Sequence, residues 1–265
     1  MHHFKKMTTM KCLLLTITFL LTTLFVNGQE EAQKAFSEGV RLLKAEKYGD
    51  AENYFSKAIA KGTTKNGLKM SYVYKAFSFN GQAKYDSAIV CFDRAIEIDS
   101  IDPATYIDRA KSYSYKKDYD EAIKDYNKVL ELDSKGKSAE AAFYYLGRIK
   151  MLIHKDEEAI KHFDKLLELV PSDYEGFFLR GTAKSNIMDI DGSIKDFDLA
   201  IKYNPNYMEA YANRGVQKIN KIPTSEKLGK KIDCLEDPCA DLLKANKMGD
   251  KSVEDMIYLY CKKCK

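Results

Sequence analysis

The 265-residue chain carries 43 lysine and arginine residues against 39 aspartate and glutamate residues, and 45% of its residues are hydrophobic. This composition is typical of a folded globular protein and argues against a disordered chain. The small net charge of +4 gives no basic surface of the kind that nucleic-acid binding requires.

The first predicted element is an apolar segment, residues 12–26, which follows three lysines and precedes Gly28. A basic start, a short apolar run and a small residue are typical of a secretory signal peptide. The run has about 15 residues, fewer than the ~20 that a transmembrane helix needs, and an uncleaved anchor is the alternative. We expect residues 1–28 to be a cleaved signal peptide and residues 29–265 to be exported, periplasmic or secreted, without a membrane span.

Further along the chain, two segments of similar sequence, KYDSAIVCFDRAIEID and DYDEAIKDYNKVLELD, begin at Lys84 and Asp118. Each has a small residue followed four positions later by an aromatic residue, and this pair recurs along the chain at alternating longer and shorter steps. The pairs are Ala51/Phe55, Ala88/Phe92, Ala122/Tyr126, Ala159/Phe163 and Ser193/Phe197. Upstream of each lies a second helical stretch with its own pair: Ala35/Gly39, Tyr72/Ala76, Tyr106/Ala110, Phe143/Gly147 and Phe177/Gly181, with a sixth copy at Tyr211/Gly215.

This pattern resembles the tetratricopeptide repeat family, whose unit is a helix–turn–helix of about 34 residues. The resemblance covers about residues 32–247, although Tyr or Phe replaces the family's usual tryptophan and the first copy has Ala35 there. It implies an all-α, right-handed α-solenoid of about six repeats with a C-terminal capping helix. The expected repeats are about 32–65, 69–102, 103–136, 140–173, 174–207 and 208–247, the last with an insertion at 220–237, and the capping helix is expected at 250–263.

The recurring positions have a packing explanation. Small residues such as Gly147 and Gly181 let the two helices of a hairpin approach closely, and aromatic residues such as Phe163 fill the space between successive hairpins. A single hairpin cannot bury its apolar face, so stacking supplies the core. Three of the five prolines fall between repeats, where a helix must stop.

Arginine replaces the family's usual apolar residue on the first helix of three repeats. In the third and fifth repeats an aspartate follows at one and the same spacing, on the facing helix, whereas the fourth repeat has Leu146 and His162 at these places. Because a planar guanidinium suits a partly buried carboxylate, we predict structural ion pairs rather than an anion-binding site. The predicted pairs are Arg109–Asp125, Arg180–Asp196 and Arg214–Asp241.

Four of the six cysteines lie near the C-terminus, in C-x4-C and C-x2-C spacings that also fit a zinc site. Because exported proteins meet oxidising conditions, we favour disulfides over zinc or free thiols. Two helices that fold back on each other at Gly249 bring together residues about equally distant from it. This favours nested bridges, Cys239–Cys261 and Cys234–Cys264, out of three possible connectivities. Cys91 is single, and we expect it to pack as a small helix residue.

The chain offers few residues for catalysis. Outside the predicted signal peptide only His154 and His162 remain, the first in a predicted turn and the second at a position where other repeats have aspartate. No glycine-rich phosphate loop, paired-histidine metal helix or nucleophile elbow is present in the sequence. We therefore expect no enzymatic activity, no metal and no cofactor.

The resemblance implies that the first helices of the repeats line a groove that binds a peptide from a partner protein. We predict a non-catalytic scaffold of the cell envelope, with Phe36, Phe77, Tyr144 and Phe178 as anchors for an apolar partner segment. The lysine and asparagine that clamp a terminal carboxylate in some family members are replaced here. The predicted groove residues are Phe36, Val40, Val73, Phe77, Ile107, Lys111, Tyr144, Arg148, Phe178, Thr182, Ala212 and Val216.

Several alternatives stay open at this stage. The predicted groove residues can instead pack against neighbouring hairpins. The surface can also serve a permanent interface, in a structural subunit of an envelope complex or in a homo-oligomer, and the cysteines leave a zinc-dependent module as a third class. The ending FVNGQ resembles exported proteins of the Bacteroidetes, which favours the periplasm. The partner itself has no signature in the sequence.

Overall fold

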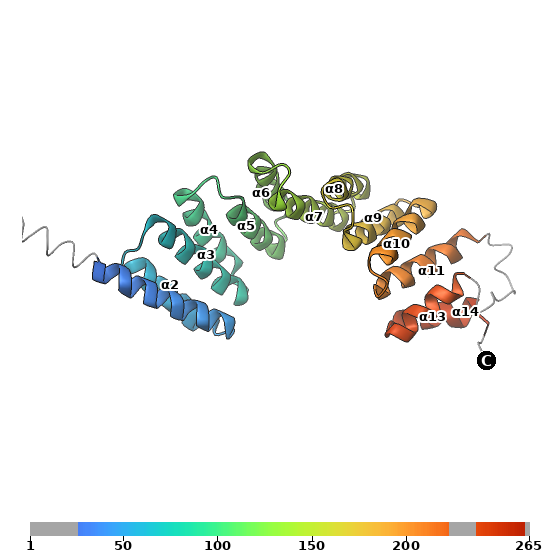
Figure 1. Cartoon of the computed structure of the whole chain (residues 1–265), viewed down its shortest axis with the longest axis horizontal. Helices are drawn as coiled ribbons and strands as arrows, with labels where there is room; N and C mark the ends of the chain where they lie inside the picture. Colours follow the sequence, from blue (N-terminus) through green and yellow to red (C-terminus); the bar gives the residue numbers. More distant parts are fainter. Residues whose placement is uncertain (1–25, 223–236, 263–265) are drawn as a thin grey trace, which may run out of the picture. The chain divides into compact units, whose positions relative to one another are not determined.

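The computed structural model describes residues 26–222 and 237–262, and every element in these ranges is a helix (Figure 1). Within each of two compact units successive helices pack on one another, and the fold is an all-α solenoid of helix–turn–helix hairpins. The chain forms two compact units, Met1–Leu132 and Asp133–Lys265. Within the described ranges we find no helix with the length and apolar character that crossing a bilayer requires.

The first unit begins with a helical segment at residues 26–44, joined by a short turn to α2. Each later helix of the unit packs on the one before it, and the last two form the hairpin of the third repeat. The remaining helices are α2 (Tyr48–Ala60), α3 (Lys65–Gly81), α4 (Tyr85–Ile98), α5 (Pro103–Lys116) and α6 (Tyr119–Leu132).

The second unit continues the same alternation. Its first five helices are α7 (Lys137–Leu152), α8 (Asp156–Leu169), α9 (Tyr174–Asn186), α10 (Ile190–Tyr203) and α11 (Met208–Lys221). Most of the insertion predicted at 220–237 lies outside the described residues. The unit closes with α13 (Cys239–Met248), a 3-10 turn η1 (Lys251–Val253) and α14 (Glu254–Tyr260).

The last helix is shorter than the predicted capping helix at 250–263. The Asp250 side chain accepts a hydrogen bond from the Ser252 backbone N–H. The segment that follows Asp250 therefore starts with a 3-10 turn instead of an α-helix. At the other end, the backbone of Cys261 is extended, with φ −104° and ψ 143°. The helix therefore has seven residues, and its ends are set by a local cap and by the extended residue that follows.

Close approach of the two helices explains the small residues of the pattern. A Cβ atom added to Gly147 would lie 2.5 Å from the ring of Phe163, which is fully buried. A Cβ atom added to Gly39 would likewise lie 2.7 Å from the buried ring of Phe55. The aromatic residue of the second helix thus fills the space that the glycine of the first helix leaves open.

Candidate partner-binding surface

In the first unit, the predicted anchors Phe36 and Phe77 belong to a row of aromatic rings. The ring centroid of Tyr74 lies 5.2 Å from that of Phe36 and 5.6 Å from that of Phe77. Phe77 in turn lies 5.8 Å from the fully buried Phe92. Phe36 and Phe77 are half-buried. The row of rings therefore packs against the core on one side and is accessible to solvent on the other.

A cavity of about 610 Å³ opens beside this row, lined by the helical residues 26–44, the loop before α3 and α3 itself. Its aromatic side is formed by Phe36 and Tyr74. Amide and hydroxyl groups complete the lining, from Gln33, Asn66 and Ser71 among others. The volume lies within the range of sites that hold a small ligand or the side chains of a peptide.

Two other predicted groove residues of the first unit contribute little accessible surface. Val73 and Ile107 are only 7% and 9% exposed, which corrects their assignment to the groove. Val73 is buried because it packs in one apolar cluster with residues of α4 such as Phe92. Lys111 pairs with Asp108, whose carboxyl oxygen lies 3.2 Å from Nζ. Val40 packs in the first hairpin.

In the second unit, Tyr144 of α7 is held by a charged neighbour. Its hydroxyl donates a hydrogen bond of 2.5 Å to Oε1 of Glu175, at the start of α9. Burial, together with this bond to the carboxylate, raises the pKa of Tyr144 to about 12. The exposed Arg148 lies over the Tyr144 ring, with its guanidinium carbon 5.4 Å from the ring centroid.

Phe178 of α9 is part of a second aromatic cluster. Its ring centroid lies 5.7 Å from that of Phe197 and 4.9 Å from that of Tyr207, the residue before α11. Tyr207 also packs edge-to-face on Tyr174, at 5.1 Å. Burial, and then the negative charge of Glu175, raises the pKa of Tyr207. Tyr174, Glu175 and Tyr207 were not predicted as site residues, because no pattern shared by the repeats marks them.

The other predicted groove residues of this unit have local contacts. The Thr182 hydroxyl donates to the backbone carbonyl of Phe178, within α9. Val216 is half-buried against the apolar cluster at the end of the unit, and Ala212 is buried in that cluster. Only part of the predicted surface is therefore free to contact another molecule.

The structure brings Arg109 together with the predicted partner Asp125. Nε and Nη2 donate to the two carboxyl oxygens, at 2.8 and 2.6 Å. The remaining nitrogen, Nη1, donates at 2.5 Å to Asp93, which belongs to the second helix of the preceding repeat. The Asp125 side chain is 7% exposed and that of Asp93 is 45% exposed. One guanidinium thus joins two successive repeats through a buried and a half-exposed carboxylate.

The same arrangement recurs twice in the second unit. In this unit the buried aspartate of each set also forms an ion pair with a lysine one helical turn after the arginine. The third repeat has Tyr113 at the position of that lysine. The second carboxylate of each set was not predicted. The sequence does mark it, because an aspartate lies 16 residues before each of the three arginines. The equivalent sets are Asp164–Arg180–Asp196 with Lys184, and Asp198–Arg214–Asp241 with Lys218.

The fourth repeat lacks the whole set. Leu146 is fully buried where the arginine would stand, and His162 and Asn127 occupy the positions of the two aspartates. Burial, and then the positive charge of Lys150, lowers the pKa of His162. All three charged positions have therefore changed together. His154, the other histidine, is exposed in the turn before α8.

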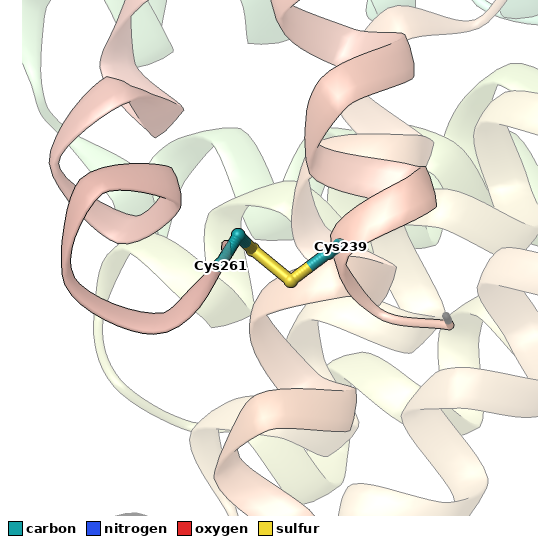
Figure 2. The surroundings of a disulfide bond; sticks show 2 residues. All are labelled: Cys239 and Cys261. Carbon is teal, nitrogen blue, oxygen red and sulfur yellow. A yellow bond between two sulfur atoms is a disulfide. The ribbon is translucent and has the colours of Figure 1, made fainter. Parts of the chain in front are cut away.

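Two cysteines of the second unit, Cys239 and Cys261, lie at the start of α13 and directly after α14 (Figure 2). Cys239 and Cys261 form a disulfide, with their Cα atoms 5.8 Å apart, and both are buried. The other two members of the predicted nested pairing, Cys234 and Cys264, lie outside the described residues. Cys91 is a buried free thiol in α4, and burial raises its pKa. Residues 26–222 and 237–262 contain no cluster of three metal-ligating side chains.

A sequence model of the tetratricopeptide repeat family matches residues 103–135. This segment is the hairpin of α5 and α6, and the same hairpin recurs in both units. Residues 103–135 are thus a tetratricopeptide repeat (TPR), and the chain has the fold of TPR proteins.

Solved structures share the fold of this chain. YrrB, described as a TPR protein with an unusual peptide-binding site, is 22% identical; the match covers 77% of this chain and 97% of YrrB, with a TM-score of 0.57. A TPR protein from Parabacteroides merdae is 17% identical over 87% of this chain and 98% of its own, with a TM-score of 0.63. A MamA fragment from Desulfovibrio magneticus is 15% identical over 71% of this chain and 97% of its own, with a TM-score of 0.56. No curated protein sequence matches the chain.

Proposed function

We propose that this TPR protein is a non-catalytic scaffold that holds a segment of a partner protein against the first helices of its repeats. The observation that carries the proposal is the cavity of about 610 Å³ beside the aromatic row of the first unit. Phe36 and Tyr74 offer apolar surface there, and the side-chain amides of Gln33 and Asn66 offer hydrogen bonds. An extended peptide matches both, because it presents apolar side chains and unpaired backbone amides.

The proposal includes an exported, periplasmic location for residues 29–265. The sequence of residues 1–28 supports it, because a basic start and a short apolar run are typical of a signal peptide. The Cys239–Cys261 bridge also favours an oxidising compartment. Cleavage before Gln29 would remove Val26 from the cavity wall and leave its aromatic side in place.

The proposal is tested by crosslinking and pull-down from native envelopes with a variant that fills the cavity. Gln33 and Asn66 are exposed, so Gln33→Arg with Asn66→Arg adds two bulky side chains at the cavity without disturbing the core. Asn53→Arg, on the exposed side of α2, is the matched control. We expect the parent and the control to capture one partner that the double variant loses, with equal far-UV circular dichroism for all three. Equal capture by all three proteins would refute a role for the cavity.

The second candidate is a permanent interface with another copy of the chain. The last helix, α14, exposes Tyr258 and Leu259, whose exposed fractions are 71% and 59%. Exposed apolar residues at the end of a repeat array favour contact with another molecule. Sedimentation at micromolar concentration distinguishes the candidates, because a stable dimer favours this second candidate and a monomer favours the scaffold.

A further inference from the structure

A half-buried carboxylate is enclosed by tyrosines on the first helices of the second unit. Glu175 of α9 accepts the hydrogen bond from Tyr144 of α7. Tyr174, also of α9, packs against Tyr207, which lies immediately before α11. Tyr207 also packs on Phe178 of α9, with the ring centroids 4.9 Å apart. Glu175 lies three residues before Phe178, on the same face of that helix. Burial, and then the charge of Glu175, raises the pKa of Tyr207. Three successive repeats thus contribute to one polar and aromatic site.

The carboxylate of Glu175 forms no ion pair with another described residue. In the part of the chain that the structure describes, no lysine, arginine or histidine lies within 4.0 Å of it. Arg148 is directed to Tyr144 instead, with Nη1 3.4 Å from the hydroxyl oxygen. Glu209, in the first turn of α11, adds a second negative charge that also raises the pKa of Tyr207. The site is therefore negative and has aromatic walls.

Two more deeply buried carboxylates of the second unit, in contrast, have basic partners. Asp196 and Asp241, whose side chains are 3% and 7% exposed, each receive bonds from an arginine and a lysine. Burying a carboxylate without a cation is costly. A partner that covers the first helices of this unit would bury Glu175 more deeply, and a basic group of the partner would offset that cost. Arg148 is the one cation placed beside Tyr144 among the described residues, against the two negative charges of Glu175 and Glu209.

We propose that this site binds a lysine or arginine side chain of the partner segment. The inference rests on the proposed scaffold function and names the chemistry of its partner. The cationic group lies at the carboxylate of Glu175, which the Tyr144 hydroxyl holds in place, and the aliphatic stem lies against the rings of Tyr174 and Tyr207. Aromatic faces attract cations, and long basic side chains cover apolar surface with their stems.

The test uses a phage library of random 12-residue peptides, selected on residues 29–265 in 0.15 M salt. Enriched peptides are synthesised, and their dissociation constants are measured on three proteins: the parent, Glu175→Gln and Glu157→Gln. The last is the matched control, because Glu157 is an exposed acid of α8 on the same unit. We expect enriched peptides to share a basic residue, and their affinity to fall about 10-fold for Glu175→Gln and to be unchanged for Glu157→Gln.

A double-mutant cycle assigns the contact. Replacing the shared basic residue of the peptide by glutamine should cost the same factor on the parent and almost nothing further on Glu175→Gln, because the pair is already broken. Enriched peptides without a basic residue, or basic peptides that bind Glu175→Gln as tightly as the parent, would overturn this inference and leave the scaffold function standing. A library that enriches nothing over the uncoated support would overturn both.

Discussion

Replacing Arg109 by leucine removes the base that holds Asp125. Among the described residues no other lysine or arginine pairs with this carboxylate, whose side chain is 7% exposed. Leaving a buried charge without its partner costs about 3–5 kcal/mol. We expect Arg109→Leu to lower the free energy of unfolding by that amount. Arg180→Leu should cost less, about 2 kcal/mol, because Lys184 still contacts Asp196 at 2.8 Å.

The loss should depend on pH. Burial raises the pKa of Asp125 even in the presence of Arg109, and removing the guanidinium raises it further. A carboxyl group whose pKa is higher in the folded than in the unfolded state binds its proton more tightly when folded. Its contribution to stability is therefore favourable at low pH and is lost as pH rises through the folded pKa. The difference between parent and variant should be largest at pH 7 and should shrink at pH 4.5.

Urea unfolding followed by circular dichroism at 222 nm measures the loss. Asp93→Asn is the matched control, because Asp93 is half-exposed and its ion pair should contribute less than about 1 kcal/mol. The double variant Arg109→Leu with Asp125→His copies the residues of the fourth repeat and should regain much of the stability. A loss below about 1 kcal/mol for Arg109→Leu, or an equal loss at both pH values, would refute the buried-pair reasoning.

Three further predictions concern stability. Burial lowers the pKa of His162 in the folded protein. The neutral imidazole therefore stabilises the fold above the unfolded-state pKa, and this contribution is lost as pH falls through the folded-state pKa. His162→Asn should weaken the loss of stability between pH 7.5 and pH 5.5, measured by thermal melts. Gly147→Ala should lower stability by about 1–2 kcal/mol because an aromatic ring occupies the space, whereas Gly49→Ala, with nothing within 4 Å, should be neutral or stabilising in the same melts. Cys261→Ser should destabilise the end of the second unit by about 3 kcal/mol, since the bridge to Cys239 closes a loop of 22 residues; unchanged amide exchange in α13 and α14 would contradict this.

The repeat pattern predicted the hairpins because the same packing problem recurs in each of them. Small and aromatic residues at fixed spacing describe how two helices meet, and the glycines do face aromatic rings such as Phe163. The regular spacing also pointed from Arg109 to Asp125, because the helices of a hairpin have similar lengths. Asp93 was not predicted, because the spacing within one hairpin does not indicate a second partner in the preceding repeat.

The candidate surface was less predictable. The position of a residue on the first helix indicates the helix face on which its side chain lies, but not how closely the next helix covers that side chain. For this reason Val73 and Ile107 were assigned to the groove, although they are buried. The site around Glu175 combines residues of three repeats that share no common spacing. Only the packed helices show that Tyr144 bonds its carboxylate and that Tyr207 packs on Phe178, three residues further along α9.

The two partners of each arginine have a consequence for the order of folding. When a chain emerges N-terminus first, from the ribosome or on the far side of a membrane, its early segments can fold before the later ones arrive. When Arg109 emerges, Asp93 is already present on the preceding repeat, whereas Asp125 has still to follow. The first helix can therefore dock on the preceding repeat before its own second helix is present. In the repeats of Arg109, Arg180 and Arg214, the second helix then arrives at a guanidinium already in place.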